Sequence, residues 1–191
     1  MSRYPTLYIL RHGETEWNLA NRLQGHFDSP LTERGREQAS AQNAILKRCG
    51  LAGVSALSSP QGRAVVTAEI ALAGTGLKAA PDPRLGEIGI GAWAGMLRET
   101  LLRQTPAAHD SYDLYEHAPE GEGFAALQKR CQRFLDSLTG PHVLITHGIT
   151  SRMLRLILLG RTPAALRDMQ GGQGVVFRLE NGQQERLTLY T

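Results

Sequence analysis

The sequence predicts an α/β fold in which a mainly parallel central sheet is flanked by helices on both faces, with a short cap segment. Three observations predict this fold. Short apolar stretches typical of strands alternate with stretches whose apolar residues follow helical spacing, and strands that alternate with helices favour parallel pairing. Glycines and prolines separate most of these stretches. Asn181-Gly182, a pair typical of a tight β-hairpin, joins the last two apolar stretches and predicts an antiparallel edge.

The expected elements follow one another in a regular order along the chain. The expected strands are short and rich in apolar residues, and they span 6–10, 54–58, 77–80, 143–146, 175–179 and 186–190. The expected helices carry apolar residues near helical spacing, and they span 32–48, 60–72, 96–104, 124–138 and 150–159. The stretch 81–95, rich in glycine and proline, is expected to be a loop.

Signals at the helix ends support these boundaries. Thr32 stands where its hydroxyl can cap the first long helix, and Pro60 suits the start of the next one. Gly50 and Gly74 follow the ends of these two helices, where glycine is common.

The composition is that of an ordinary globular chain. Of its 191 residues, 41% are hydrophobic and 20% are charged, which allows a substantial single core and argues against disorder. We find neither an internal repeat nor a domain linker. Residues 1–191 are therefore expected to form one domain, with a cap segment at about 94–120.

Charge and hydropathy exclude several classes of partner. The net charge is +3 and the pI is near 9.1, but the basic residues are scattered and only 6% of residues are aromatic, so nucleic-acid binding is not expected. A small anionic substrate suits this balance equally well. No apolar run approaches the ~20 residues of a membrane span, and the N-terminus lacks the pattern of a signal peptide. We therefore expect no membrane partner and a cytoplasmic location.

The cysteines and most of the histidines show no metal-binding pattern. Cys49 and Cys131 lie in different helical segments outside any CxxC pattern, and they are expected to be buried, reduced thiols. Four histidines without metal-ligand spacing are expected at the surface, namely His26, His109, His117 and His142. Neither a metal ion nor a cofactor is therefore expected.

Chemically capable side chains directly follow three of the predicted strands. Ligands of a parallel sheet bind beyond the carboxyl ends of its strands. The residues found there are Arg11-His12 after the first strand, Ser59 with Arg63 after the second, and His147-Gly148 after the strand over 143–146. These positions are expected to form one site.

The residue types suit the transfer of a phosphoryl group. A phosphate monoester needs cationic donors, a nucleophile in line with the leaving group, and a proton for the departing oxygen. Arg11 and Arg63 offer planar forks for phosphate oxygens, and Asn18 offers a neutral donor. His12 can attack as a neutral imidazole, which neighbouring cations favour by lowering its pKa.

Two further groups complete the expected chemistry. Gly148 lets the backbone approach an anion at the start of a helix, where free N–H groups point at the ligand. Glu87 is the candidate general acid, because an alkoxide leaving group must be protonated. The alternative for Glu87 is a loop glutamate that pairs with Arg84.

Five segments, in this order, resemble the histidine phosphatase superfamily, which includes the cofactor-dependent phosphoglycerate mutases and many small phosphatases. They are RHGETEWN at 11–18, LQGHFDSPLTERGREQA at 23–39, SSPQGRAVVTA at 58–68, LGEIGIGAWAG at 85–95 and ITHGIT at 145–150. The resemblance implies that His12 carries the phosphoryl group, that Arg63 and His147 contact it, and that Glu87 donates the proton. It also places Thr15, Gln24 and Gly25 on the substrate side of the pocket.

Two positions depart from the family pattern. Ala94 stands where many members carry an acidic residue, and Gly123 stands where a serine often precedes the long helix. Glycine is an acceptable residue at a helix start. Neither change removes a group that the chemistry uses.

The sequence therefore predicts a phosphomonoesterase that acts through a phosphohistidine on a small phosphorylated metabolite. One alternative is a phosphoryl transfer of the phosphoglycerate mutase type, and another is a non-catalytic domain that binds a phosphorylated ligand. Hydrolysis is favoured because the cap segment is shorter than the insertion in the mutases that the chain resembles, and because only Thr191 follows the last predicted strand.

Overall fold

The computed structural model describes residues 4–190, so the ends of the predicted domain, 1–3 and 191, lie outside the described residues. Six strands form one mixed sheet in the order β3-β2-β4-β1-β5-β6. They are β1 (Leu7–Arg11), β2 (Ser55–Ser58), β3 (Ala79–Pro81), β4 (His142–Thr146), β5 (Val176–Glu180) and β6 (Gln183–Leu187). The first four pair in parallel, and β5 pairs antiparallel with both β1 and β6. The predicted parallel sheet with an antiparallel hairpin at one edge is confirmed.

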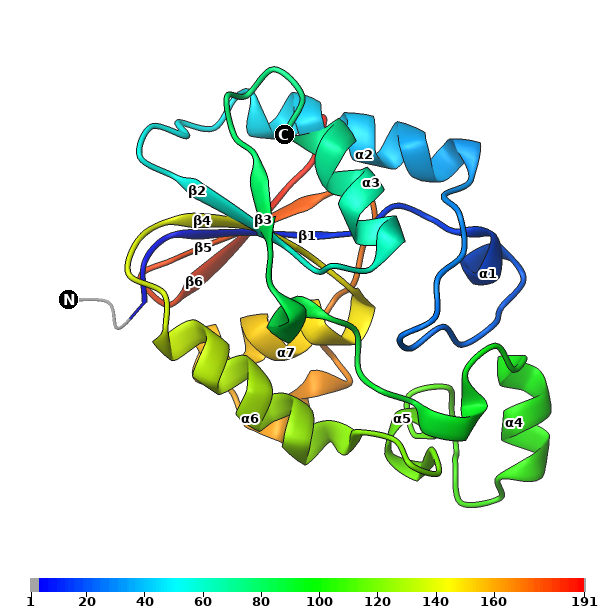
Figure 1. Ribbon diagram of the computed structural model, residues 1–191. Coiled ribbons are helices and arrows are strands. Elements are labelled where there is room, and N and C mark those ends of the chain that lie inside the picture. The colour runs from blue at the N-terminus through cyan, green and yellow to red at the C-terminus, as the bar shows by residue number, and fades with distance from the viewer. Residues whose placement is uncertain (1–3, 191) are drawn as a thin grey trace.

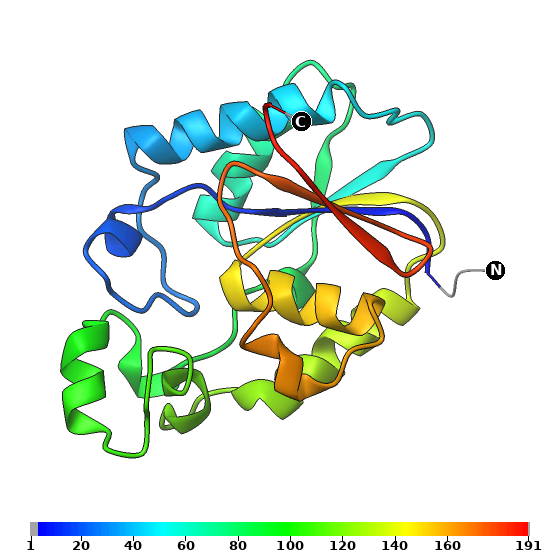
Figure 2. The same ribbon diagram turned by 180° about the vertical axis from the view of Figure 1, so that it is seen from behind.

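Helices cover both faces of this sheet. They are α1 (Glu16–Leu19), α2 (Glu33–Leu46), α3 (Gly62–Ala71), α4 (Arg98–Gln104), α5 (Leu114–His117), α6 (Gly123–Asp136) and α7 (Gly148–Leu158). Figures 1 and 2 show α2 and α3 on one face and α6 and α7 on the other, with α4 and α5 beyond the edge of the sheet. Among the described residues, no helix combines the length and the hydrophobicity that crossing a membrane requires.

Alternation along β1 shows how the sheet separates two cores. Leu7 and Ile9 pack into the core under α6 and α7, whereas Tyr8 and Leu10 pack into the core under α2 and α3. All four side chains are buried. A strand buried on both faces is hydrophobic throughout, which is why the period-two pattern is absent from its sequence.

The structure corrects both boundaries of the last predicted strand, and the cause is the turn before it. Asn181 and Gly182 have φ values of 52° and 74°, so they form a two-residue turn, and Glu180 pairs directly with Gln183. The last strand is therefore Gln183–Leu187 and not 186–190. The predicted loop 81–95 contains two short 3₁₀ helices, Pro83–Leu85 and Gly91–Trp93.

The structure confirms the predicted cap at Thr32 and explains the glycine at position 123. The Thr32 hydroxyl accepts a hydrogen bond from the Gly35 N–H, as a capping residue should. Gly123 has a φ of 67°, a left-handed conformation that disfavours serine, so glycine suits this position in this chain.

One cysteine departs from the prediction. Both cysteines are free, as expected, but only Cys131 is buried, whereas Cys49 is half-buried. Burial raises the pKa of Cys131 to about 12, so its thiol stays protonated at neutral pH.

A close contact between backbones fixes the loop that follows β1 against the start of α2. A Cβ atom at Gly35 would collide with the carbonyl group of Glu14, and one at Gly13 would collide with the carbonyl group of Gly35. Thr32 adds a backbone bond from its N–H to the Glu14 carbonyl at 2.9 Å. The loop after β1 can therefore take this position only because both residues lack a side chain.

This contact predicts a large penalty for Gly35→Ala. Since backbone atoms would have to move, we expect the free energy of unfolding to fall by ~1–3 kcal/mol or more. Gly50→Ala is the matched control, because a Cβ at Gly50 would meet nothing within 4 Å, and its effect should stay within ~0.5 kcal/mol. Urea unfolding measures both. Equal stabilities for the two variants would contradict the contact.

Candidate active site

The carboxyl ends of three adjacent strands bring the predicted side chains together. Arg11 ends β1 and is followed by His12, Ser59 follows β2, and His147 follows β4, which lies between β2 and β1 in the sheet. The His12 N–H donates to the Thr146 carbonyl at 2.9 Å, so β1 and β4 stay paired up to the site. The strand-end expectation is confirmed for these residues.

Beyond these strand ends lies a cavity of about 480 Å³. Eight of the ten predicted site residues line it, namely Arg11, His12, Asn18, Gln24, Gly25, Arg63, Glu87 and Gly148. Thr15 and His147 do not line it, and both are fully buried. The cavity falls in the usual size range for small-molecule sites.

His12 is held as a neutral imidazole whose Nε2 carries no proton. Its Nδ1 lies 2.7 Å from the Gly13 carbonyl oxygen, which makes Nδ1 the protonated nitrogen. Its Nε2 then accepts a hydrogen bond from Arg63 Nε at 3.3 Å. Burial, followed by the charges of Arg11 and Arg63, holds the pKa of His12 well below its usual range. The nitrogen that can attack an electrophile is therefore unprotonated at neutral pH.

Arg63 is buried, and the loop over 25–28 holds its guanidinium. Its Nη1 donates to the Phe27 carbonyl at 2.6 Å and to the Asp28 carboxylate at 2.8 Å, while its Nη2 donates to the Gly25 carbonyl at 2.8 Å. Burial lowers the pKa of Arg63, and the carboxylates of Glu87 and Asp28 partly offset this effect. Asp28 received no role from the sequence, although it lies inside a segment that resembles the family.

His147 is the second histidine of the site, and Ser59 orients it. The two imidazole rings lie 5.1 Å apart between their centroids. His147 Nε2 lies 2.8 Å from the Ser59 hydroxyl, whereas its buried Nδ1 has no hydrogen-bond partner among the described residues. Burial, followed by the charges of Arg63, His12 and Arg11, holds the pKa of His147 well below its usual range. If Ser59 donates to Nε2, Nδ1 carries the proton and can donate it to an anion.

Glu87 lies at the start of α7. Its carboxylate accepts hydrogen bonds from the Ile149 N–H at 3.2 Å, from the Thr150 N–H at 3.0 Å and from the Thr150 hydroxyl at 3.1 Å. The alternative pairing of Glu87 with Arg84 was wrong, because Arg84 forms its ion pair with Asp82 at 2.6 Å. A carboxylate at a helix N-terminus is favourably placed.

Gly148 leaves open the space between an arginine and this carboxylate. A Cβ at this position would lie 3.4 Å from Arg11 Cζ and 3.5 Å from the Glu87 Oε2 atom. Arg11 Nε is buried and has no hydrogen-bond partner among the described residues. An anion in this space would meet both the Arg11 guanidinium and the first turn of α7.

The predicted substrate-side residues have different positions. Thr15 caps α1, and its hydroxyl accepts hydrogen bonds from the Asn18 N–H at 3.2 Å and from Gln24 Nε2 at 2.7 Å. It therefore lies behind Asn18 and Gln24, which face the cavity. Gly25 has a φ of 50°, and a Cβ there would lie 2.5 Å from an Ile90 carbon, so this position requires glycine.

Sequence reasoning missed Gln61, which links several parts of the site. Its side-chain oxygen accepts from the Glu87 N–H at 3.0 Å and from the Ser59 hydroxyl at 3.3 Å, and its Nε2 donates to the Gly25 carbonyl at 2.8 Å. The signal in the sequence that could have identified Gln61 was its position in SSPQGRA, inside a segment that resembles the family. Reasoning also missed four cavity-lining arginines that come from scattered segments, Arg22, Arg98, Arg152 and Arg167.

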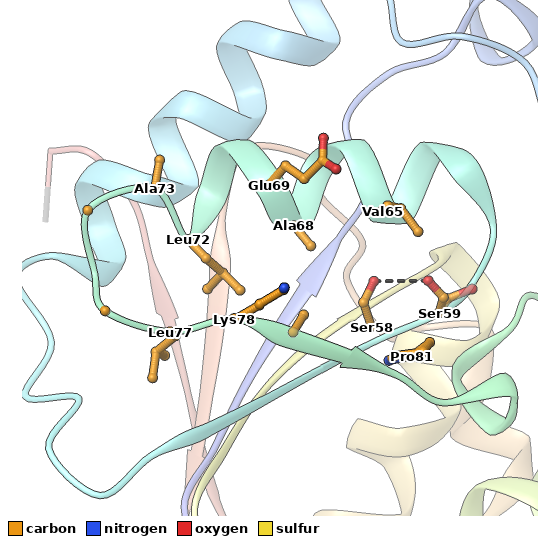
Figure 3. A pocket seen from close by; sticks show the side chains of 13 residues that line it. Ser58, Ser59, Val65, Ala68, Glu69, Leu72, Ala73, Leu77, Lys78 and Pro81 are labelled. Atoms are coloured by element: carbon orange, nitrogen blue, oxygen red, sulfur yellow. Dashed lines mark hydrogen bonds between the residues drawn. The ribbon is translucent and has the colours of Figure 1, made fainter.

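A larger groove of about 740 Å³ lies between α3 and β3 and is shown in Figure 3. The charged side chains that line it are Glu69 and Lys78, and neither arginine nor histidine lines it. Its walls are otherwise largely apolar. The smaller, arginine-lined cavity is therefore the better site for a phosphorylated ligand.

Comparisons with known proteins agree with this geometry. The family described as histidine phosphatase superfamily (branch 1) matches residues 7–190. The protein named "Probable phosphoglycerate mutase GpmB" of Proteus mirabilis is 36% identical over 174 residues, which cover 86% of this chain and 79% of the relative.

Two solved structures are similar along almost the whole chain. The alpha-ribazole phosphatase from Shigella flexneri has a TM-score of 0.81 and 26% identity, with 97% of this chain and 96% of that chain covered. YhfR from Bacillus stearothermophilus has a TM-score of 0.80 and 31% identity, with 96% of each chain covered.

The buried neutral histidines predict a pH dependence of stability. Their pKa values are lowered in the folded state, whereas histidine titrates near pH 6.5 in an unfolded chain. Below about pH 6.5 the unfolded chain therefore binds protons that the folded protein does not, and the free energy of unfolding falls. Each histidine adds a slope of up to about 1.4 kcal/mol per pH unit, and above pH 6.5 its contribution is fully present.

Urea unfolding between pH 5.5 and 7.5 measures this slope. His147→Asn should reduce it, whereas His109→Gln, a change at an exposed position, should leave it unaltered. A wild-type stability that does not change over this range would show that the two buried histidines are protonated in the folded protein.

Proposed function

The chain belongs to the histidine phosphatase superfamily, branch 1, and from this membership we propose that it is a phosphomonoesterase whose nucleophile is His12. The observation that carries the proposal is the state of His12. Its Nδ1 donates to the Gly13 carbonyl, its Nε2 keeps a lone pair, and its pKa is lowered by burial among arginines. A neutral imidazole in an arginine-lined cavity suits attack on a phosphate ester.

The proposed reaction has two steps. In the first, His12 Nε2 attacks phosphorus, the bond from phosphorus to the ester oxygen breaks, and protonated Glu87 gives its proton to that oxygen. In the second, water attacks the phosphohistidine, Glu87 takes a proton from the water, and the bond from nitrogen to phosphorus breaks. Inorganic phosphate leaves and His12 is again neutral. No metal or cofactor enters either step.

The surrounding groups would stabilise the transferring charge. Arg11 Nε is a buried donor without a partner among the described residues. His147 Nδ1 is a second one when the Ser59 hydroxyl donates to His147 Nε2 instead of to Gln61, and a bound phosphoryl group would then give both of them an acceptor. The N–H groups at the start of α7 add a favourable dipole. Such prearranged donors commonly make the largest contribution to catalysis of this kind.

The names of similar proteins include both a mutase and a phosphatase, so phosphoryl transfer back to the substrate is the second candidate. A mutase must keep water from its phosphohistidine while an intermediate turns round. We infer hydrolysis because the segment proposed as the cap, about 94–120, contributes only five of the seventeen residues that line the cavity, namely Arg98, Asp110, Ser111, Tyr112 and Tyr115. The non-catalytic alternative is disfavoured, since every group that the mechanism needs is present.

His12→Ala tests the nucleophile. We expect the variant to lose at least about 10³-fold in phosphate release from p-nitrophenyl phosphate, because the substitution removes the attacking nitrogen. Rapid quenching of the wild-type protein should trap an acid-labile, base-stable adduct on His12. A fully active variant would refute the mechanism.

To separate hydrolase from mutase, 3-phosphoglycerate is supplied with a trace of 2,3-bisphosphoglycerate. Accumulation of 2-phosphoglycerate faster than phosphate release would favour the mutase.

Glu87→Gln tests the proton donor. The change preserves shape but removes the proton that a poor leaving group needs. We expect the rate with alkyl phosphates to fall at least about 10²-fold, and the rate with p-nitrophenyl phosphate, whose leaving group needs no acid, to fall far less. Equal losses on both substrate types would mean that Glu87 only positions neighbouring groups.

A further inference from the structure

We propose that Gln173 is a positioning residue of the active site, which fixes the side-chain amide of Asn18 so that Asn18 Nδ2 is directed at the phosphoryl group. Gln173 acts through Asn18 and does not itself contact the substrate. The inference rests on the proposed phosphomonoesterase function, in which Asn18 offers a neutral donor. Gln173 lies outside the five segments that resemble the family, and it has no step in the proposed mechanism.

Gln173 belongs to a glycine-rich segment, 170–174, that leads into β5 beside the end of β1. Figure 2 shows this segment in orange. A glutamine on α2 holds its far end, because Gln42 Nε2 donates to the Val175 carbonyl at 3.2 Å. The same nitrogen donates to the Arg11 carbonyl at 2.9 Å. The end of the segment is therefore tied to the last residue of β1.

A buried arginine holds the other end of the segment. Arg155 on α7 donates from its Nη2 to the Gln170 carbonyl at 2.6 Å. Its guanidinium carbon lies 3.8 Å from the centroid of the Phe177 ring in β5. The segment is thus fixed at both ends by groups other than the side chain of Gln173. A substitution of that side chain should leave the backbone of the segment in place.

The amide of Gln173 can take only one orientation. Its Nε2 lies 3.2 Å from the His12 carbonyl oxygen and 3.3 Å from Asn18 Oδ1. Since a backbone carbonyl can only accept a hydrogen bond, the Gln173 atom that faces it must be the nitrogen. Nε2 carries two hydrogens, so it can donate to both oxygens.

The amide of Asn18 is fixed from two sides. The Thr15 N–H, which can only donate, lies 3.3 Å from Asn18 Oδ1. Gln173 Nε2 is the second donor to this oxygen. If the Asn18 amide were turned over, its NH₂ group would face two donors and accept from neither. The two donors therefore select the orientation in which Oδ1 faces the protein.

This orientation makes Nδ2 the group that Asn18 offers to the cavity. Asn18 lines the cavity, and within residues 4–190 its side chain forms hydrogen bonds through Oδ1. A phosphoryl group needs donors around its oxygens, which Nδ2 supplies. With the amide turned over, Oδ1 would face the same negative oxygens and repel them. Loss of Gln173 removes one of the two hydrogen bonds that prevent this reversal.

Gln173→Met tests the role, because methionine has a similar length and lacks the amide. We expect kcat/KM for p-nitrophenyl phosphate to fall about 10-fold and the inhibition constant of inorganic phosphate to rise about 3-fold or more, as loss of one hydrogen bond allows. Gln170→Met is the matched control, since it makes the same change at an exposed residue of the same segment. It should alter neither constant.

A double-mutant cycle shows whether Gln173 acts through Asn18. In a protein that already carries Asn18→Ala, Gln173→Met should change kcat/KM less than about 2-fold, because no amide is left to orient. A purely structural effect of Gln173→Met would instead persist in that protein. Should either variant not fold, Gln173→Leu and Asn18→Ser complete the same cycle.

A spectroscopic signal follows Asn18 without the need for turnover. In ¹⁵N-labelled wild-type protein, the side-chain NH₂ signals of Asn18 are those lost in Asn18→Ala. They should shift when inorganic phosphate is added, and Gln173→Met should reduce this shift by half or more. Gln170→Met should leave it unaltered.

The outcomes separate this inference from the function beneath it. A Gln173→Met protein with wild-type kcat/KM and wild-type phosphate inhibition would overturn the positioning role and leave the phosphomonoesterase intact. A full effect of Gln173→Met in the Asn18→Ala protein would also overturn it. If the wild-type protein hydrolyses no phosphate ester, the proposed function itself fails, and the response of the Asn18 signals to phosphate still decides whether Gln173 orients the amide.

Discussion

The gathering of Arg63, His12 and His147, all buried, with the partly buried Arg11 at one edge of the sheet is the constraint on which the rest of the structure depends. Burial lowers the pKa of Arg11, Arg63, His12 and His147 alike, and the charges of the two arginines lower the pKa of both histidines further. The histidines respond by staying neutral. The arginines remain charged, because guanidinium groups do not lose their proton in proteins, so acceptors must be built around them.

The loops around the strand ends provide these acceptors. Backbone carbonyls at Gly25 and Phe27 and the carboxylate of Asp28 surround Arg63, and Gln61 ties Gly25 to the loop that carries Glu87. The close contact between Gly13 and Gly35 presses the loop after β1 against α2. These contacts fix the loops that carry Arg63, Glu87 and His12 relative to one another.

The cavity divides into an inner and an outer part with different origins. The inner part comes from the strand ends and the start of α7, and it is the part that we propose binds the phosphate. The outer part draws its arginines from α4, from α7 and from the turn after α1, together with tyrosines from the segment before and within α5. Loops and short helices can change while a sheet stays the same, which gives a physical reason why proteins of one fold differ in substrate.

The sequence by itself determined the order of the elements, the parallel sheet with its antiparallel hairpin, and the strand-end positions of Arg11, His12 and His147, because these follow from local patterns and from a general rule about parallel sheets. Only the tertiary structure decided that Glu87 lies at the start of α7 and not beside Arg84. It also decided that Ser59 contacts His147. The same holds for Arg98 and Arg152, which line one cavity. The contacts of Glu87 and Ser59 join residues that are 63 and 88 positions apart, and Arg98 and Arg152 come from unrelated segments, so no local spacing specifies these neighbours. Packing of the helices and loops against the sheet sets them, because packing alone determines which distant side chains meet.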